Sequence, residues 1–399
     1  MMKPKILLFS TLSPYPFWAG SEKYWFDLVT DPRTCKRFEF HIRLAYSPVT
    51  QHKATELEAA GAKVQFYRHH NIHFVRRNLA KLRDRLTGSA VRRLPWYDEI
   101  IRGDWDLVWL NVDGFANFRE LEYPVRICES KKIPYWLMLQ HANEDFYLDS
   151  HECLQTYTYI AETAKRFVFV AERNRTSFER AICRKLTNYL LTRNGLTSEA
   201  LEEAKNISIS FPVKSERKVR FLNLGRFSPL DKGQHLILES LSSEKWKGRD
   251  WQLSFVGLSE FGREYLKNLS SYFGLESKRI DVVPFLHNVF EIIANNDILL
   301  MPSLSEGTPF AMIEAMACGR PAVGTPVGGI PELIIDGKTG WLAKTTHVSD
   351  ISEAMERMWQ DRKSWAAIGK NASDHVASEN NYDTLFTTIL DNLEADTER

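Results

Sequence analysis

The stretch 302–321, PSLSEGTPFAMIEAMACGRP, indicates how the second half of this 399-residue chain folds. The residues before it, 297–301, are apolar enough to form a buried strand, and a loop rich in small and polar residues follows. Helical spacing of the apolar side chains then predicts a helix over 310–318, which Gly319 and Pro321 end. A strand, a tight loop and a helix in this order are typical of an α/β domain with a parallel sheet.

Two glutamates, Glu306 in the loop and Glu314 in the helix, stand in this stretch with seven residues between them. The amides of Gly307 and Thr308 lie at the predicted helix N-terminus, where unpaired N–H groups and the helix dipole favour phosphate or sugar oxygens. Glu306 can accept hydrogen bonds from sugar hydroxyls, and Glu314, among apolar neighbours, from both hydroxyls of a ribose. A solvated helix glutamate is the alternative interpretation of Glu314.

The remaining apolar runs alternate with stretches long enough for helices, and the alternation starts again after residue 218. Short, fully apolar strands in such a pattern are typical of parallel sheets covered on both faces. We predict an α/β protein of two facing, Rossmann-like, doubly wound domains, with an N-terminal domain over 1–205, a linker over 206–218, a C-terminal domain over 219–375, and a C-terminal helix over 376–399 that packs back toward the first domain. Strands are expected at 5–10, 38–46, 62–67, 106–112, 134–140, 166–171 and 188–193, and then at 219–225, 252–257, 279–286, 297–302 and 321–326.

The composition, with 44% apolar and 26% charged residues, is that of a folded globular protein. The sequence contains no run of eighteen apolar residues, which a transmembrane helix would need. Five scattered cysteines without a CxxC pair indicate reduced thiols, so we expect a cytoplasmic protein. The net charge is only +1, but residues 1–213 carry 31 basic and 25 acidic side chains, net +6, and the remainder carries 21 and 26, net −5. An anionic partner is therefore expected for the first half alone.

The segment 221–241, FLNLGRFSPLDKGQHLILESL, carries the second group of candidate binding residues. Gly225 ends an apolar strand, Arg226 and Lys232 lie in the loop after it, and Gly233 precedes a helix. Ligands of doubly wound sheets bind outside the carboxyl ends of the strands, and two cations there suit a diphosphate whose charge grows as a glycosidic bond breaks. Alone these cations would fit a solvated surface; with the two glutamates they predict a nucleotide-sugar site.

Three segments resemble one family of enzymes. GRFSPLDKG, PSLSEGTPFAMIEAMACGRPAV and GTPVGGIPELIIDGKTGWLA are similar to the C-terminal domain of the retaining, nucleotide-sugar-dependent glycosyltransferases of family 4, whose two facing Rossmann-like domains form the GT-B fold. The resemblance is specific over residues 219–345 and weaker before them. It implies a hexosyltransferase-type glycosyltransferase of polysaccharide biosynthesis that retains anomeric configuration and uses a nucleoside-diphosphate sugar as co-substrate. We expect no cofactor, and no metal, because the cations Arg226 and Lys232 already supply the charge that a metal would give.

The resemblance also implies roles for individual residues. The set implied to be catalytic is His141, Glu306, Arg226 and Lys232. Arg226 and Lys232, next to Gly225, would bind the donor diphosphate. Glu306 and the backbone of Gly307, Thr308, Pro309 and Phe310 would contact the sugar and phosphate, Glu314 would bind the ribose, and Phe285, Leu286 and His287 would lie against the base. The family often has glycine at the position of His287.

The first half matches the family more loosely. Segment 13–29 resembles the glycine-rich loop after the first strand, but it has Ala-Gly-Ser-Glu where Gly-Gly-x-Glu is common. Close approach of the backbone to donor phosphate or acceptor is therefore expected at Gly20 and Ser21. His141 matches a histidine that in the family donates a hydrogen bond near the donor sugar; a satisfied loop histidine is the alternative.

Two further motifs have less specific interpretations. Asn194-Gly195 resembles the Asn-Gly that the family has near the interdomain hinge, and we interpret it as turn chemistry rather than a ligand contact. Asp104-Trp105-Asp106 spells the DxD of metal-dependent glycosyltransferases, but it precedes an apolar strand, at the sheet end opposite the predicted site. We interpret it as a strand-entry turn.

Residues 63–93 are strongly basic, with nine Lys and Arg, one acid and three histidines. They fit either a helix with a solvated basic face or a surface that docks on an anionic membrane or an anionic acceptor, and the sequence leaves both open. The expected partners are a nucleotide-sugar donor and a saccharide or lipid-linked acceptor, with no nucleic acid. The protein would then be cytoplasmic, with peripheral binding at the inner face of a membrane left open.

Competing functions use the same two-domain architecture. A nucleotide-sugar epimerase or hydrolase could bind the same donor, and a non-catalytic sugar-nucleotide sensor would fit a first half that has lost one loop glycine. A dehydrogenase is disfavoured, because no GxGxxG follows the first strand of either half.

Overall fold

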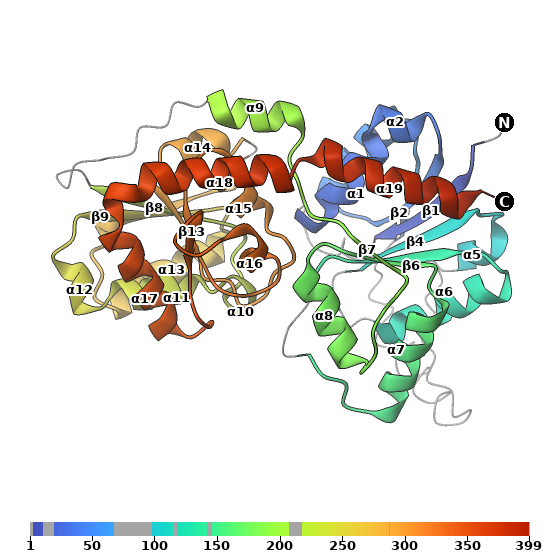
Figure 1. The fold of residues 1–399 in the computed structure, drawn as a ribbon, viewed down its shortest axis with the longest axis horizontal. Coiled ribbons are helices and arrows are strands. Elements are labelled where there is room, and N and C mark those ends of the chain that lie inside the picture. Colours follow the sequence, from blue (N-terminus) through green and yellow to red (C-terminus); the bar gives the residue numbers. More distant parts are fainter. Residues whose placement is uncertain are drawn as a thin grey trace. The chain divides into compact units, whose positions relative to one another are not determined.

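The computed structural model describes residues 3–10, 20–67, 98–112, 114, 118–141, 146–206, 218–286 and 288–398. The chain divides into two units (Figure 1), one made of Met1–Thr192 with Phe386–Arg399 and the other of Arg193–Leu385. The linker predicted over 206–218 lies, except for its two end residues, outside the described residues. The predicted domain boundaries stay a prediction.

The described part of the first unit contains one seven-stranded sheet, in which every pair of neighbours is parallel and the strand order is β3-β2-β1-β4-β5-β6-β7. The order reverses between β1 and β4, so the ends of these two strands form the topological switch point of the sheet. The strands are β1 Lys5–Ser10, β2 Glu39–Ala45, β3 Lys63–Tyr67, β4 Leu107–Val112, β5 Tyr135–Leu139, β6 Arg166–Phe169 and β7 Tyr189–Leu191. The helices are α1 Gly20–Thr30, α2 Pro32–Cys35, α3 Pro48–Ala59, α5 Asp98–Arg102, α6 Phe118–Ser130, α7 His151–Thr163 and α8 Glu172–Ala181.

The described part of the second unit contains a six-stranded parallel sheet of order β10-β9-β8-β11-β12-β13. Its strands are β8 Val219–Leu224, β9 Trp251–Val256, β10 Ile280–Val283, β11 Ile298–Met301, β12 Ala322–Gly324 and β13 Gly340–Leu342. Its helices are α9 Ser198–Asn206, α10 Pro229–Lys232, α11 Gln234–Leu241, α12 Glu244–Lys247, α13 Glu260–Tyr272, η3 Ser277–Arg279, α14 Phe290–Ala294, α15 Phe310–Ala317, α16 Ile330–Leu333, α17 Val348–Gln360, η4 Arg362–Ser364 and α18 Trp365–Glu379.

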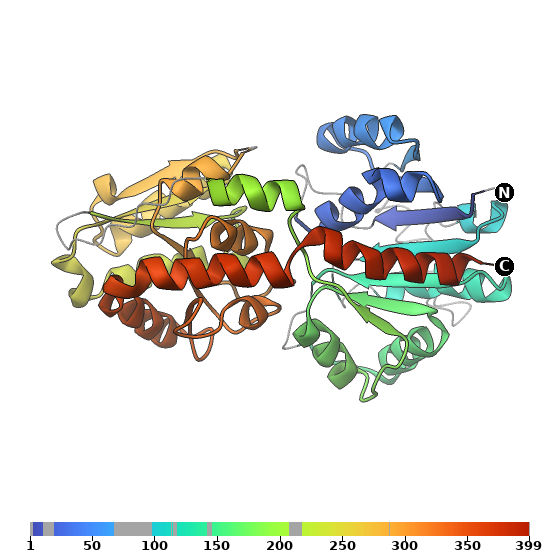
Figure 2. The same ribbon diagram turned by 45° about the horizontal axis from the view of Figure 1, so that its top comes forward.

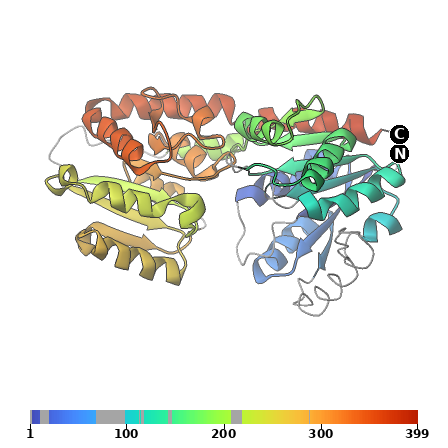
Figure 3. The same cartoon turned by 90° about the horizontal axis from the view of Figure 1, so that it is seen from below.

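Helices cover both faces of the second sheet (Figure 3). Successive side chains of a strand point to opposite faces, so each face of the sheet has apolar side chains that a helix layer buries. Along β11, Ile298 and Leu300 pack in a core with α11, α13 and α17, whereas Leu299 and Met301 pack in another core with α9, α14, α15, α16 and α18. This two-sided burial is the physical reason why the strand reads as a continuous apolar run in the sequence.

Helix α19, Tyr382–Thr397, ends the chain and lies with most of its length on the first unit, where Figure 2 shows it running past the strands. The carboxylate of Asp396 is buried there. It accepts hydrogen bonds from the Trp136 indole N–H at 3.0 Å and from the Arg166 guanidinium at 2.5 Å. The Phe386 ring lies 3.9 Å below the Arg33 guanidinium. These contacts fix the end of the chain on the first unit.

The predicted α/β fold class is confirmed, and each predicted strand overlaps a strand of the structure. The observed strands are shorter at their ends; for example, the strand expected at 279–286 is β10, Ile280–Val283. Strand β13 was not predicted, since it has three residues between turns. None of the described helices is long and apolar enough to cross a membrane.

Candidate functional site

The loop between β8 and α11 holds two of the predicted binding residues, Arg226 and Lys232, and Asp231 contacts several groups in it. The carboxylate oxygen Oδ2 of Asp231 accepts hydrogen bonds from Arg226 Nη2 at 2.9 Å and from Ser228 Oγ at 2.6 Å. Pro229 starts the one-turn helix α10, which ends at Lys232. The Arg226 side chain is 42% exposed, so its guanidinium is held on one side by Asp231 and reaches solvent on the other.

Lys232 and Glu306, which the sequence analysis assigned to different parts of the donor, contact each other. Lys232 Nζ lies 2.6 Å from Glu306 Oε1, and Ser303 Oγ donates to the same oxygen at 2.8 Å. The Glu306 side chain is only 7% exposed. A carboxylate this deeply buried needs a partner, because an uncompensated buried charge costs several kcal/mol.

The backbone brings this ion pair together, since β8 and β11 are neighbours in the sheet. The carbonyl oxygen of Asp231 accepts the N–H groups of Leu304 at 2.7 Å and Ser305 at 3.2 Å, so the loop after β11 is fastened to the loop after β8. Gly233 lies between them with φ +61°, and a Cβ there would stand 2.1 Å from the carbonyl oxygen of Pro302. Only glycine fits this position without a backbone shift.

The Glu306–Thr308 loop is packed against the turn that follows β12. Gly329 N donates to the carbonyl oxygen of Gly307 at 2.6 Å. A Cβ on Gly328, whose φ is +51°, would stand 2.2 Å from the carbonyl oxygen of Glu306. In a planar trans peptide the N–H of the next residue points away from the carbonyl, so the N–H of Thr308 points away from the Gly329 turn.

Helix α15 presents the remaining candidate carboxylate. Pro309 is the N-cap residue, and no side chain makes a capping hydrogen bond there. Most side chains of the helix are buried, whereas Phe310, Ala311 and Glu314 are half-buried. Because residues four apart share a helix face, Glu314 lies on the face of Phe310, one turn from the helix start.

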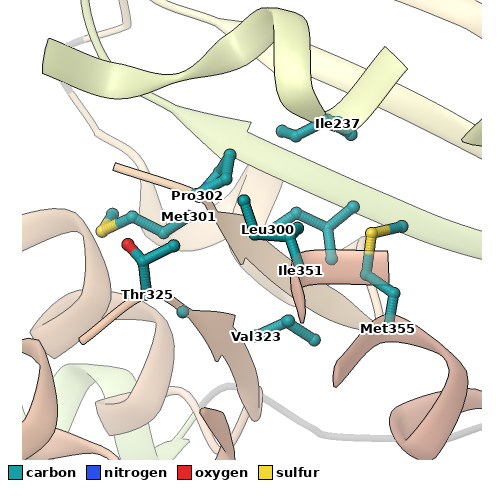
Figure 4. Close-up of a pocket in the computed structure, with 9 residues that line it drawn as sticks. Ile237, Leu300, Met301, Pro302, Val323, Thr325, Ile351 and Met355 are labelled. Carbon is teal, nitrogen blue, oxygen red and sulfur yellow. The ribbon is translucent and has the colours of Figure 1, made fainter. Parts of the chain in front are cut away.

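An apolar pocket lies beneath these loops. Figure 4 shows it between α11, α17 and the ends of β11 and β12, lined by Ile237, Leu300, Met301, Pro302, Val323, Gly324, Thr325, Ile351 and Met355. None of these side chains is charged, and none of the predicted site residues lines it. We therefore assign the pocket to the core that supports the loops, not to the binding site.

The residues predicted to contact the base lie apart from the loop that holds Arg226 and Lys232. Phe285 is 67% exposed and Leu286 is half-buried after β10, while His287 lies outside the described residues. Strand β9 separates β10 from β8, so these residues leave the same carboxyl edge of the sheet two strands away from Arg226.

In the first unit, Gly20 is the exposed first residue of α1 and Ser21 follows it in the helix. His141 comes two residues after β5 and is half-buried. Near the switch point a buried carboxylate, Glu22, accepts hydrogen bonds from Ser10 Oγ at 2.8 and 2.9 Å, and Asn111 Nδ2 donates to that hydroxyl at 3.2 Å. This polar cluster was not predicted, although Glu22 is the last residue of the Ala-Gly-Ser-Glu segment; the signal for it was three polar residues at the ends of apolar strands and a helix start.

The Asp104-Trp105-Asp106 segment precedes β4 at the amino end of the sheet. Asp106 Oδ2 accepts the backbone N–H of Lys5 at 2.7 Å, and Trp105 Nε1 donates to the carbonyl oxygen of Glu99 at 3.1 Å. This is the expected strand-entry turn. Within the described ranges, no three His, Cys, Asp or Glu side chains gather as a metal-ligating group.

One family model matches the part of the chain that carries this site. Residues 205–375 match the family model described as "Glycosyl transferases group 1". Among curated relatives, N-acetyl-alpha-D-glucosaminyl L-malate synthase of Bacillus anthracis is 32% identical over 110 residues, which are 26% of this chain and 29% of that protein.

A second relative matches this chain over a longer stretch. N,N'-diacetylbacillosaminyl-diphospho-undecaprenol alpha-1,3-N-acetylgalactosaminyltransferase of Campylobacter jejuni is 27% identical over 294 residues, 66% of this chain and 73% of that protein. The chain thus spans from less than a third to about three quarters of the length of these two relatives.

Solved structures share the architecture over the whole chain. Anabaena HepE in complex with UDP-glucose superposes with a TM-score of 0.71 at 18% identity, covering 98% of this chain and 99% of that one. A glycosyltransferase of Rickettsia africae gives a TM-score of 0.73 at 15% identity, covering 100% and 99%. The fold of this protein is therefore GT-B.

The crowding at Gly233 gives a stability prediction. Gly233→Ala should destabilise the second unit by more than about 2 kcal/mol, because alanine is strained at positive φ by roughly 1–2 kcal/mol and its Cβ also meets the Pro302 carbonyl. Gly337→Ala, with φ +73° and open space, should show the strain alone, and Gly248→Ala neither effect. Chemical denaturation of the three variants measures this; equal losses for Gly233→Ala and Gly337→Ala would contradict the packing argument.

Proposed function

We propose that this protein is a glycosyltransferase that binds a nucleoside-diphosphate sugar in its second unit and transfers the sugar to an acceptor hydroxyl. The observation that carries the proposal is the arrangement of Arg226, Lys232 and Glu306 at the carboxyl ends of two neighbouring strands, within the part of the chain that matches glycosyl transferases group 1. The UDP-glucose complex of the structurally similar HepE supports the choice of a nucleotide sugar as donor.

The geometry leaves both cations able to bind phosphate. Lys232 carries three N–H donors, of which one is directed at Glu306, and Arg226 carries five, of which the Asp231 contact uses one. The remaining donors, in the loop after Gly225, would hold the diphosphate together with the amides that follow Gly307 at the start of α15. Glu306 and Glu314 would accept hydrogen bonds from sugar and ribose hydroxyls, with Phe285 and Leu286 against the base.

These groups would act most strongly as the glycosidic bond breaks. Negative charge then develops on the departing diphosphate, and fixed cations stabilise it without reorganising. We propose that His141 donates a hydrogen bond near the sugar, and that the leaving phosphate helps to deprotonate the acceptor hydroxyl on the same face. Such a reaction retains the anomeric configuration, as expected for a family 4 enzyme.

Removing the Lys232 cation should therefore slow the transfer. Lys232→Ala is expected to lower turnover about a hundredfold, the typical loss of one fixed group that stabilises developing charge. The matched control is Lys185→Ala, because Lys185 also pairs with a buried glutamate, Glu179, at 2.8 Å and has no proposed role. Steady-state assays follow a thermal-shift panel of nucleoside diphosphates and their sugars, which identifies the donor. Near wild-type turnover in Lys232→Ala would remove the diphosphate role.

The same assay separates the alternatives. A labelled donor that is hydrolysed or epimerised without any acceptor would favour the hydrolase or epimerase. Tight donor binding without turnover of any acceptor would favour the non-catalytic sensor.

Retention and independence from metal ions are a joint prediction. The glycosidic bond of the product should have the same anomeric configuration as the donor, and excess EDTA should leave the rate unchanged, because Arg226 and Lys232 supply the positive charge. Proton NMR of the anomeric signal and rates before and after chelation test this. An inverted product, or activity that EDTA abolishes and Mg²⁺ or Mn²⁺ restores, would contradict it.

We further propose a saccharide acceptor linked to a membrane lipid, with peripheral binding to an anionic membrane through residues 63–93. The support is the diphospho-undecaprenol acceptor in the name of the Campylobacter relative and the nine basic residues of this segment, most of which lies outside the described residues. Vesicles rich in anionic lipid should sediment the protein at low ionic strength, and salt should release it, since each basic group contributes about 1 kcal/mol near such a surface. Protein that stays in solution at low salt would exclude the membrane part.

A further inference from the structure

The side chain of Asn194, just after β7, is tied to the candidate donor loop. It is 4% exposed, and its Nδ2 donates to the backbone carbonyl oxygen of Thr308 at 2.6 Å. Thr308 is itself 3% exposed and precedes the N-cap residue of α15. The sequence interpretation of Asn194-Gly195 as turn chemistry is therefore incomplete, because the amide spans 114 residues to reach this loop.

A second buried asparagine joins the same point. Asn380, which is fully buried at the end of α18, donates through Nδ2 to the carbonyl oxygen of Asn194 at 2.8 Å. Its own carbonyl accepts the N–H of Leu196 at 3.0 Å, and the carbonyl of Leu196 accepts the N–H of Tyr382 at 2.9 Å. A Cβ on Gly195 would stand 2.5 Å from the Asn380 carbonyl oxygen, so these segments touch backbone to backbone.

The segments that carry Asn194 and Asn380 lie at the two ends of the second unit, where the chain enters it at Arg193 and leaves it at Leu385. We call these two segments the chain connections. Charged side chains strengthen the junction, since Arg193 contacts Glu332 of α16 at 3.3 Å and Glu379 of α18 at 3.1 Å. These contacts hold the two connections against each other. The Asn194 side chain also holds them to the loop that precedes α15.

The contact controls the direction of the loop's peptide groups. The Gly307 carbonyl is held by Gly329 N and the Thr308 carbonyl by Asn194 Nδ2. Because each peptide is planar, fixing two successive carbonyls fixes the N–H of Thr308 and the entry of the chain into α15. Without the Asn194 amide, the buried Thr308 carbonyl loses a partner, and the peptide can rotate to find another.

We propose that Asn194 is a positioning residue that aligns the Gly307–Phe310 backbone for the donor phosphate and sugar, and that it carries the effect of nucleotide binding to the Asn380 connection. The proposal rests on the proposed function for the identity of the ligand. It assigns Asn194 no contact with the substrate, and it makes Asn194 the link between the loop and both chain connections.

Two asparagine variants separate the two halves of the proposal. Asn194→Asp keeps the size of the side chain but sets a carboxylate oxygen against the Thr308 carbonyl, whereas Asn380→Asp breaks the contact with Asn194 and leaves the Thr308 contact in place. Both are buried substitutions in one junction, so a general loss of stability would affect both. Asn194→Ala, which adds no charge, replaces Asn194→Asp if that variant does not fold.

The measurements are hydrogen–deuterium exchange of the full chain and calorimetric binding of UDP, GDP and ADP. Without ligand, Asn194→Asp should speed exchange of the amides of 307–312, and Asn380→Asp should not. The nucleotide that binds the wild type should protect 307–312 and 380–385. We expect Asn194→Asp to weaken its binding about tenfold and to abolish protection of both segments, and Asn380→Asp to lose protection of 380–385 alone.

Equal exchange of 307–312 in the wild type and Asn194→Asp, or equal nucleotide affinity, would overturn the positioning role. Loss of affinity in both variants in proportion to their loss of thermal stability would show a structural role only and would also overturn it. If none of the three nucleotides binds the wild type, the proposed function fails, while the exchange of ligand-free 307–312 still decides the role of Asn194.

Discussion

The contact between the loops after β8 and β11 is the constraint on which the candidate site depends. These strands are neighbours because the sheet order reverses between them, so their carboxyl ends open side by side. The Asp231 carbonyl fastens the second loop to the first, and Gly233 allows the two backbones to meet at Pro302. Lys232 and Glu306, far apart in sequence, are within hydrogen-bonding distance as a result.

The charges of the site are arranged in pairs. Arg226 is held by Asp231 and Lys232 by Glu306, so each cation has an acidic neighbour before any ligand arrives. Pairing fixes the direction of two long side chains that would otherwise lose conformational entropy on binding. It also keeps the nearly buried Glu306 from being an uncompensated charge. A diphosphate would add to these pairs through the unused N–H donors, so it need not break them.

The strands and their order of appearance were predictable, because two-sided burial turns each one into a short apolar run in the sequence, as in β4 and β11. Strand β13 was not, since Gly340–Leu342 is too short to show a period. Glu306 and Lys232 were found through their positions after strands. Asp231 was overlooked, although it stands next to Lys232, because its value lies in a side-chain contact with Arg226 and a backbone contact with Leu304.

The sequence by itself determined the α/β class, every strand except β13, and the loops from which Arg226, Lys232 and Glu306 project, because these follow from local periodicity and from glycine and proline at element ends. Only the tertiary structure decided that Lys232 and Glu306 pair with each other, and that Asn194 reaches Thr308. Such contacts join segments 74 and 114 residues apart, and their geometry depends on sheet order and on the close approach of backbones, which no local pattern encodes.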